Sequence, residues 1–137
     1  MSTFFKSIAL AAQGLKAQSG RMRVVAENIA NADSSPTKAG EEPYRRKVAT
    51  FERRYDAEIG GSGVQMGRVR ADGSAFRARY EPGHPAADAN GFVSMPNVDP
   101  LIEQADMREA QRSYEANVNV ISATRRMLAR TLDILKI

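Results

Sequence analysis

Residues 4–29, FFKSIALAAQGLKAQSGRMRVVAENI, decide the fold because they carry one apolar stripe with helical spacing. Successive stripe positions are alternately four and three residues apart, which predicts a long helix with a narrow apolar seam. Gly14 and Gly20 each cost up to about 1 kcal/mol relative to alanine inside a helix, so we expect packing partners to supply its stability. The stripe consists of Phe4, Ile8, Ala11, Leu15, Gln18, Met22, Val25 and Ile29.

The end of the chain predicts a second long helix, beginning after Pro100 and containing no internal glycine or proline. Its acidic residues lie mainly toward its start and its basic residues toward its end, the polarity that the helix dipole favours. The expected seam is Ala110, Tyr114, Ile121, Leu128 and Leu135, flanked by Val118 and Leu132 on one side and by Asn117, Thr124 and Thr131 on the other.

The segment between these helices has the pattern of short strands. Residues 31–36, NADSSP, should end the first helix, because Asn, Asp and Ser bond their own backbone and proline cannot continue the helix. Short apolar runs then alternate with glycine-rich and Asn-Gly turns, which predicts three or four strands in hairpins. The runs cover residues 44–55, 63–70, 74–80 and 92–95.

These elements together predict an α+β fold. We expect the terminal helices to pack as an antiparallel coiled-coil hairpin around a small inserted β-rich region. The expected division is an N-terminal helix (1–33), a loop and β-rich middle (34–99) and a C-terminal helix (100–137). The two helical segments would form one core domain.

Composition excludes several classes of protein. The chain has 137 residues and no cysteine, so it has no disulfide framework, thiolate metal site or cysteine nucleophile. The net charge of +4 is spread as +3 over residues 1–30, 0 over 31–100 and +1 over 101–137, without the basic patch that nucleic-acid binding requires. No run approaches the roughly 18 apolar residues of a membrane span, and the start lacks the pattern of a cleaved signal peptide.

No catalytic, cofactor or metal site is expected. His84 is the only histidine and lies between glycine and proline, which favours a turn residue over a metal ligand or a catalytic base. Asp88-Ala89-Asn90-Gly91 resembles the start of a calcium loop but lacks the later glutamate, so an Asn-Gly turn is the better interpretation. The basic run 45–47 is flanked by glutamates, and no phosphate-binding glycine loop is present, so neither nucleic acid nor a small-molecule substrate is expected.

The helices carry more apolar surface than one hairpin buries. Side chains outside the expected seams need neighbours, and these are Phe5, Leu10, Met107, Val120 and Met127. This surplus predicts a structural assembly subunit rather than an enzyme. A soluble helical adaptor or chaperone that binds partner helices is the alternative; it should fold alone, whereas an assembly subunit should gain helicity on polymerising.

Three stretches together resemble the FlgC-type proximal rod proteins of the bacterial flagellar basal body. The first is RMRVVAENIANAD (21–33), followed by PYRRK (43–47). The second is YEPGHPAADANGFVSMPNVD (80–99), and the third is residues 107–134, including SYEANV (113–118). The ENIAN-type motif is shared by rod and hook proteins generally, whereas the PGHP and MPNVD stretch is specific to the FlgC type.

This resemblance implies a function. The protein would polymerise through its terminal helices in the proximal rod and help to transmit torque from the motor to the hook and filament. Its partners would be further copies, other rod proteins and the flagellar type III export apparatus, and it would reach the periplasm without leader cleavage.

The expected assembly interface combines the helix seams with polar residues that would fix register or end the first helix. Gln18 and Asn117 would fix the register, and Asn28 and Asn31 would end the first helix. The full set is Phe4, Ile8, Leu15, Gln18, Met22, Val25, Asn28, Ile29, Asn31, Tyr114, Asn117, Val118, Ile121, Leu128, Leu132 and Leu135.

Overall fold

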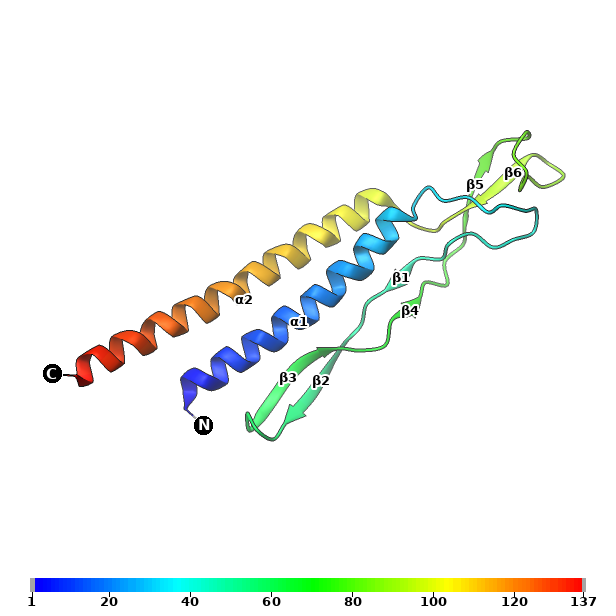
Figure 1. Ribbon diagram of the computed structural model, residues 1–137. Coiled ribbons are helices and arrows are strands. Elements are labelled where there is room, and N and C mark those ends of the chain that lie inside the picture. The colour runs from blue at the N-terminus through cyan, green and yellow to red at the C-terminus, as the bar shows by residue number, and fades with distance from the viewer. Residues whose placement is uncertain (1, 137) are drawn as a thin grey trace. The chain divides into compact units, whose positions relative to one another are not determined.

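The computed structural model describes residues 2–136. Along the chain, one long helix precedes six short strands and a second long helix follows them (Figure 1). The helices confirm the predicted element types at both ends of the chain, and the strands confirm a small β-rich middle. The elements are α1 (Thr3–Ala30), β1 (Lys47–Val48), β2 (Phe51–Asp56), β3 (Gly61–Met66), β4 (Arg70–Ala71), β5 (Arg77–Tyr80), β6 (Phe92–Met95) and α2 (Pro100–Leu135).

Polar side chains cap the C-terminal end of α1 and the N-terminal end of α2. The Asn31 amide donates to the Glu27 carbonyl at 2.9 Å and satisfies part of the last turn of α1. At the start of α2, the Asp99 carboxylate accepts from the Leu101 N–H at 2.9 Å, the geometry of an N-cap. Pro100 occupies the first helical position, where a missing N–H costs nothing.

The chain divides into two compact units, and each helix contributes to both. Unit 1 contains Met1–Met22, Thr50–Arg68 and Arg108–Ile137, and unit 2 contains Arg23–Ala49 and Val69–Met107. The division into 1–33, 34–99 and 100–137 stays a prediction, and its outermost positions, 1 and 137, lie outside the described residues.

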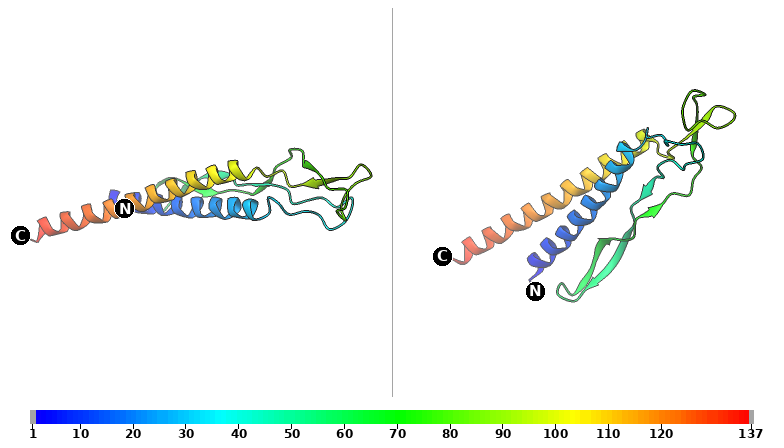
Figure 2. Two further views of the ribbon diagram at one scale, coloured as in Figure 1. Left: turned by 90° about the horizontal axis from the view of Figure 1, so that it is seen from above. Right: turned by 45° about the vertical axis from the view of Figure 1, so that its right-hand side comes forward.

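In unit 1, α1 lies between α2 and the β2–β3 hairpin (Figures 1 and 2). The strands pair antiparallel from Phe51 opposite Met66 to Asp56 opposite Gly61. On the hairpin side, the Gln13 amide donates to Asp56 at 3.1 Å, and a side chain at Gly63 would collide with Gln13. On the α2 side, the Asn117 side chain occupies the space above Gly14.

The expected coiled-coil hairpin is wrong, although the helices run in opposite directions within unit 1. Their backbones do not approach closely over a run of residues, as the paired seams of a coiled coil would. The buried positions of α1 are mostly small or polar, including Ala11, Gly14 and Ala17, rather than Leu15 and Met22. Because the β2–β3 hairpin also packs on α1, the buried surface of α1 is divided between this hairpin and α2. It does not form one seam against α2 alone.

In unit 2, short strand pairs and loops surround a small apolar cluster of Ala86, Val93 and Met95. Here β1 pairs with β4, and β5 pairs with β6, both antiparallel. Gly91 turns the chain before β6 with φ of +84°, and Tyr80 and Pro82 leave little space for a Cβ there. The Tyr80 and Phe92 rings meet edge to face at 5.3 Å.

The middle region forms three separate two-stranded sheets within residues 2–136. The predicted 44–55 run is interrupted after Val48, and β3 begins at Gly61, inside the predicted glycine turn. An isolated two-stranded pair is at best marginally stable in water, so each of these sheets depends on packing against other elements. No helix among the described residues has the length and apolar character needed to cross a membrane.

Candidate functional site

The candidate site is a polar junction in unit 2, centred on Asn28 near the end of α1. Its side chain is almost completely buried and makes four hydrogen bonds. The amide nitrogen donates to the Lys47 carbonyl at 2.8 Å and to Glu103 at 3.1 Å, while its oxygen accepts from the Lys47 N–H at 2.9 Å. The same oxygen accepts from the Tyr44 hydroxyl at 2.8 Å. Asn28 therefore joins α1 to β1 and to α2.

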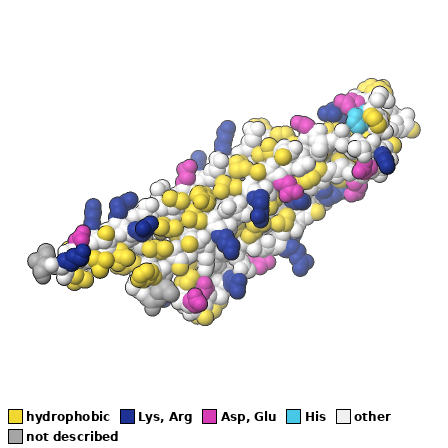
Figure 3. Space-filling model, viewed as in Figure 1, with side chains coloured by type: hydrophobic (Ala, Val, Ile, Leu, Met, Phe, Trp, Pro, Cys, Tyr) yellow, Lys and Arg dark blue, Asp and Glu magenta, His cyan; other side chains and the backbone are white. Residues whose placement is uncertain are grey.

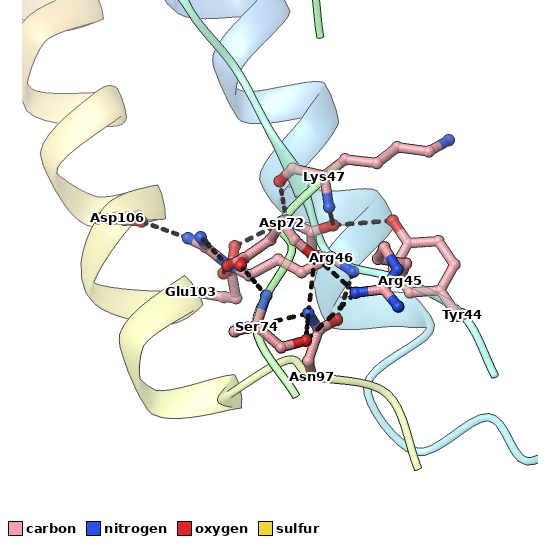
Figure 4. A network of polar contacts seen from close by, with 10 residues as sticks. Tyr44, Arg45, Arg46, Lys47, Asp72, Ser74, Asn97, Glu103 and Asp106 are labelled. Atoms are coloured by element: carbon pink, nitrogen blue, oxygen red, sulfur yellow. Dashed lines mark hydrogen bonds and ion pairs between the residues drawn. The ribbon is translucent and has the colours of Figure 1, made fainter. Parts of the chain in front are cut away.

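Glu103, in the first turn of α2, supplies the buried carboxylate of this polar junction. Its side chain has no exposed surface. The carboxylate accepts hydrogen bonds from the Arg46 Nε–H and from the Asn28 amide. Arg46 also lies 3.3 Å from Asp72 and 3.5 Å from Asp106, so one guanidinium faces three carboxylates (Figure 4). This pairing offsets the cost of burying Glu103 and orients the planar Arg46 fork.

Asn97 extends the polar junction to the segment before α2. Its oxygen accepts from the Arg46 N–H at 2.7 Å, and its amide donates to the carbonyls of Asp72 and Ser74 at 3.1 and 3.2 Å. Arg45 donates to the same two carbonyls (Figure 4). Its guanidinium also stacks over the Phe76 ring, 4.2 Å from the ring centroid. These contacts hold the loop after β4 between the segment that enters β1 and the segment that precedes α2.

Electrostatics reinforce the polar junction. Burial, together with the negative charges of Glu27 and Glu103, raises the pKa of Tyr44 to about 12, so the phenol stays a donor. Burial opposes the charged form of Arg46, but the hydrogen bonds and charges of Glu103 and Asp72 outweigh it and raise the pKa of Arg46. Hydrogen bonds from Ser74, followed by Arg46, lower the pKa of Asp72.

This arrangement suits positioning rather than chemistry. Each central polar group is held by a fixed partner, and Arg46 and Tyr44 are kept in their ordinary charge states. Elsewhere in unit 2, the His84 ring accepts from the Ala86 N–H at 3.0 Å and lies 3.1 Å from the Ser35 hydroxyl. Among residues 2–136, no group of three or more His, Cys, Asp and Glu side chains could hold a metal ion.

The sequence-predicted interface residues of α1 occupy varied environments. Val25 and Asn28 are buried, and Asn28 belongs to the polar junction. Gln18 is partly covered, and its side-chain oxygen is buried without a hydrogen-bond partner. The remaining predicted residues of α1 are half-buried, as is Asn31 just after the helix: Phe4, Ile8, Leu15, Met22, Ile29 and Asn31.

On α2, predicted interface residues become more exposed toward the end of the helix. Val118, Leu132 and Leu135 are exposed, and the others are half-buried: Tyr114, Asn117, Ile121 and Leu128. The face shown in Figure 3 carries a band of hydrophobic side chains over the helices, interrupted by Lys and Arg. The structure brings Asn117 beside Gly14, and the assembly role of the set stays a prediction.

Sequence reasoning missed most of the polar junction. Glu103 resembles an ordinary first-turn acid of a helix, and the flanking glutamates favour a solvated strand or an intersubunit salt bridge for the basic run that contains Arg46. Both Asn28 and Asn97 lie in quoted motifs, ENIAN and MPNVD. The usable signal was that each asparagine stands next to an apolar residue, Ile29 or Val98, because a polar side chain that is buried beside apolar neighbours needs hydrogen-bond partners.

Comparisons with known proteins agree over nearly the whole chain. The family model described as the C-terminal region of the flagellar basal body rod FlgEFG proteins matches residues 89–134. The chain is 51% identical to the flagellar basal-body rod protein FlgC of Agrobacterium fabrum, covering 93% of this chain and 91% of the relative. It is 40% identical to FlgC of Bacillus subtilis (96% and 98% covered) and 42% identical to FlgC of Salmonella typhimurium (91% and 92%).

Proposed function

The chain belongs to the FlgC family of flagellar basal-body rod proteins, and we propose that it is a structural subunit of the proximal rod. It polymerises through its terminal helices and helps to transmit torque from the motor to the hook and filament. The observation that carries this proposal is identity of 40–51% with the three FlgC relatives above, over more than nine-tenths of each chain. A protein of this family is a basal-body component and a structural protein.

The polar junction serves this function by holding the helices where they meet. Torque passing through a subunit loads the connections between its elements, and a flexible connection would dissipate that load. Asn28, Arg46 and Glu103 connect α1, the segment entering β1 and α2 through buried, charge-assisted hydrogen bonds. The polar junction therefore acts as a rigid joint, and the protein needs no catalytic group.

The assembly surface is the exposed part of the terminal helices. Phe5, Leu10, Val120 and Met127 are exposed, as expected from the sequence, whereas Met107 is half-buried. Partners are further copies and other rod proteins. Of the sequence-predicted set, Val25 and Asn28 are buried within the subunit and are left out of the proposed interface. The proposed interface comprises Phe4, Ile8, Leu15, Gln18, Met22, Ile29, Asn31, Tyr114, Asn117, Val118, Ile121, Leu128, Leu132 and Leu135.

The route to the assembly site also belongs to this proposal. The chain leaves the cytoplasm unfolded through the flagellar type III export apparatus, without leader cleavage, and joins the rod in the periplasm. The chain has no cysteine, so no disulfide would oppose unfolding before export.

The proposal is tested with the full-length chain, by amide hydrogen exchange and circular dichroism in dilute and assembled samples. We expect exchange in 1–30 and 101–137 to slow on assembly and helicity to rise. A dilute monomer whose terminal helices are already strongly protected would favour the adaptor or chaperone alternative.

Two neighbouring substitutions on α2 give a matched comparison. Val118→Asp introduces a charge at a proposed interface position, whereas Asn119→Asp introduces the same charge at an exposed position outside the set. Val118→Asp should raise the concentration needed for assembly about tenfold, equivalent to about 1.4 kcal/mol. Asn119→Asp should change it less than about twofold. Equal effects would contradict the proposed interface.

A further inference from the structure

The two units carry opposite net charges. Unit 1 contains twelve basic and six acidic side chains, and unit 2 contains eight basic and ten acidic ones. Their net charges are therefore +6 and −2. Charge separation of this kind favours association between unlike parts of different copies over association between like parts.

The start of α2, in unit 2, exposes two large apolar side chains. Leu101 is 76% exposed and Ile102 is 55% exposed. Asp99, which caps the helix, is also exposed beside them. Adjacent exposed apolar side chains of this size form a patch that binding to another molecule would bury.

The end of α2, in unit 1, carries the complementary combination. Leu132, Ile134 and Leu135 are exposed, the last at 75%. Arg126 and Arg130 are exposed one helical turn apart, and Figure 3 shows hydrophobic and basic side chains together toward this end of the helix. The start of α2 is therefore apolar and acidic, and its end is apolar and basic.

The end of α2 also extends past its helical neighbour in unit 1. Gly14 lies opposite Asn117, and Arg21 lies opposite Glu109. Continuing this antiparallel spacing places Thr3, the first residue of α1, beside residue 128. The following residues, 129–135, have no α1 residue beside them, which explains the exposure of Leu132 and Leu135.

We propose that the start of α2 in one copy docks on the end of α2 in a second copy. Leu101 and Ile102 pack on Leu132 and Leu135, and the acid at Asp99 faces the bases at Arg126 and Arg130. A continuous helix of 36 residues is about 54 Å long, so its own ends cannot meet. The two surfaces differ, so the contact is heterologous and repeats without closing unless a rotation completes a ring.

This inference rests on the proposed polymerisation and identifies one contact within it. Disulfide cross-linking tests the contact directly, because the chain has no cysteine of its own. Full-length Leu101→Cys and isotopically labelled Leu135→Cys are mixed, assembled and oxidised. The mixed 101–135 dimer should exceed each same-position dimer at least fivefold. Ala116→Cys, an exposed position in the middle of α2, is the control partner.

The outcomes separate this contact from polymerisation itself. If the chain assembles but 101–135 cross-links do not exceed those with position 116, the proposed contact is wrong while the proposed function stands. Predominant 101–101 dimers would indicate a two-fold contact and also overturn it. If Leu101→Cys cross-links to another rod protein instead of to Leu135→Cys, a second copy is not the occupant and the proposed contact is wrong. No assembly of the unmodified chain under any condition would contradict the proposed function.

Charge reversal supplies a second test. Arg126→Glu with Arg130→Glu should weaken self-association at least tenfold, measured by sedimentation velocity. Arg108→Glu with Arg112→Glu makes the same charge change at the same spacing on α2 and should weaken it less than threefold. Gln104→Lys places a base near Leu101 and should restore association of the first variant. Equal loss in both double variants, without restoration, would overturn the proposed charge pairing.

Discussion

Arg46 binds Glu103 through its guanidinium Nε, and the Glu103 side chain is completely buried. The pair connects the segment entering β1 to α2 across 57 residues of sequence. Removing one member of a buried ion pair costs far more than removing an exposed one, because the remaining charge loses its compensation. This contact is therefore the point at which the polar junction is most sensitive to substitution.

Glu103→Ala should lower the free energy of unfolding by about 3 kcal/mol, the low end for a buried pair, since Arg46 keeps Asp72 and Asp106 nearby. Urea denaturation of the dilute full-length chain measures the loss. The control is Glu109→Ala, which removes an exposed partner of Arg21 and should cost less than about 1 kcal/mol. Similar losses in both variants would contradict a special role for the polar junction.

Tyr44 predicts a stability loss at alkaline pH. Its phenol has a pKa of about 12 in the folded chain, against 10.0 as the ordinary value. The fold thus favours the neutral phenol, so this contribution is complete below pH 10 and is lost as pH rises from about 10 to about 12. Ultraviolet absorbance should show a tyrosine titrating near 12.

Tyr44→Phe supplies the control for that titration. The variant should lack the late component and lose about 1 kcal/mol at neutral pH, since Asn28 loses a hydrogen bond. A titration near 12 that persists in Tyr44→Phe would assign the shift to a different tyrosine.

Gly14 tests how closely the helices pack in unit 1. A Cβ at this position would lie 2.8 Å from Asn117 side-chain atoms, inside van der Waals contact. Gly14→Ala alone should therefore fail to give the roughly 1 kcal/mol that alanine normally adds in a helix. In an Asn117→Ala background, which removes the obstacle, the same substitution should recover about 1 kcal/mol by thermal or urea unfolding. Equal effects in both backgrounds would mean that Asn117 moves aside freely.

Gln18 separates monomer stability from assembly. Its buried oxygen has no hydrogen-bond partner, so Gln18→Leu should stabilise the dilute monomer by about 1 kcal/mol. If Gln18 fixes the register between subunits, the same variant should give polymers of mixed geometry, visible by electron microscopy. Uniform polymers from Gln18→Leu would remove the register role, and Ala12→Leu, at an exposed α1 position, controls for added apolar surface.

Local signals predicted the helices well and the strands only in part. The apolar periodicity of residues 4–29 and the uninterrupted run after Pro100 correspond to α1 and α2, because helix formation depends on neighbours three and four positions away. The strands were shorter and more divided than predicted, since Ala49 and Thr50 interrupt the first run. Cross-strand partners, which stabilise strands, are distant in sequence and invisible to local patterns.

The candidate site depended on contacts that no local pattern specifies. Asn28 was expected to end the first helix, and the basic run with Arg46 was expected to be a solvated strand or an intersubunit salt bridge. Both residues instead bind Glu103 within the same chain. Their interaction requires residues separated by 75 and 57 positions to meet. A polar residue in a motif indicates only that it needs a hydrogen-bond partner. Which residue is that partner depends on the tertiary structure.

By itself, the sequence determined two long helices, a β-rich middle and the family relationship, because periodicity and motifs are properties of consecutive residues. Only the tertiary structure decided which helix face is buried. The β2–β3 hairpin covers part of the surface of α1. Small residues such as Gly14 and Ala17 line the buried face of that helix, whereas larger residues such as Leu15 are half-buried. Periodicity identifies an apolar face, but competition among all the elements that pack against it decides what covers that face.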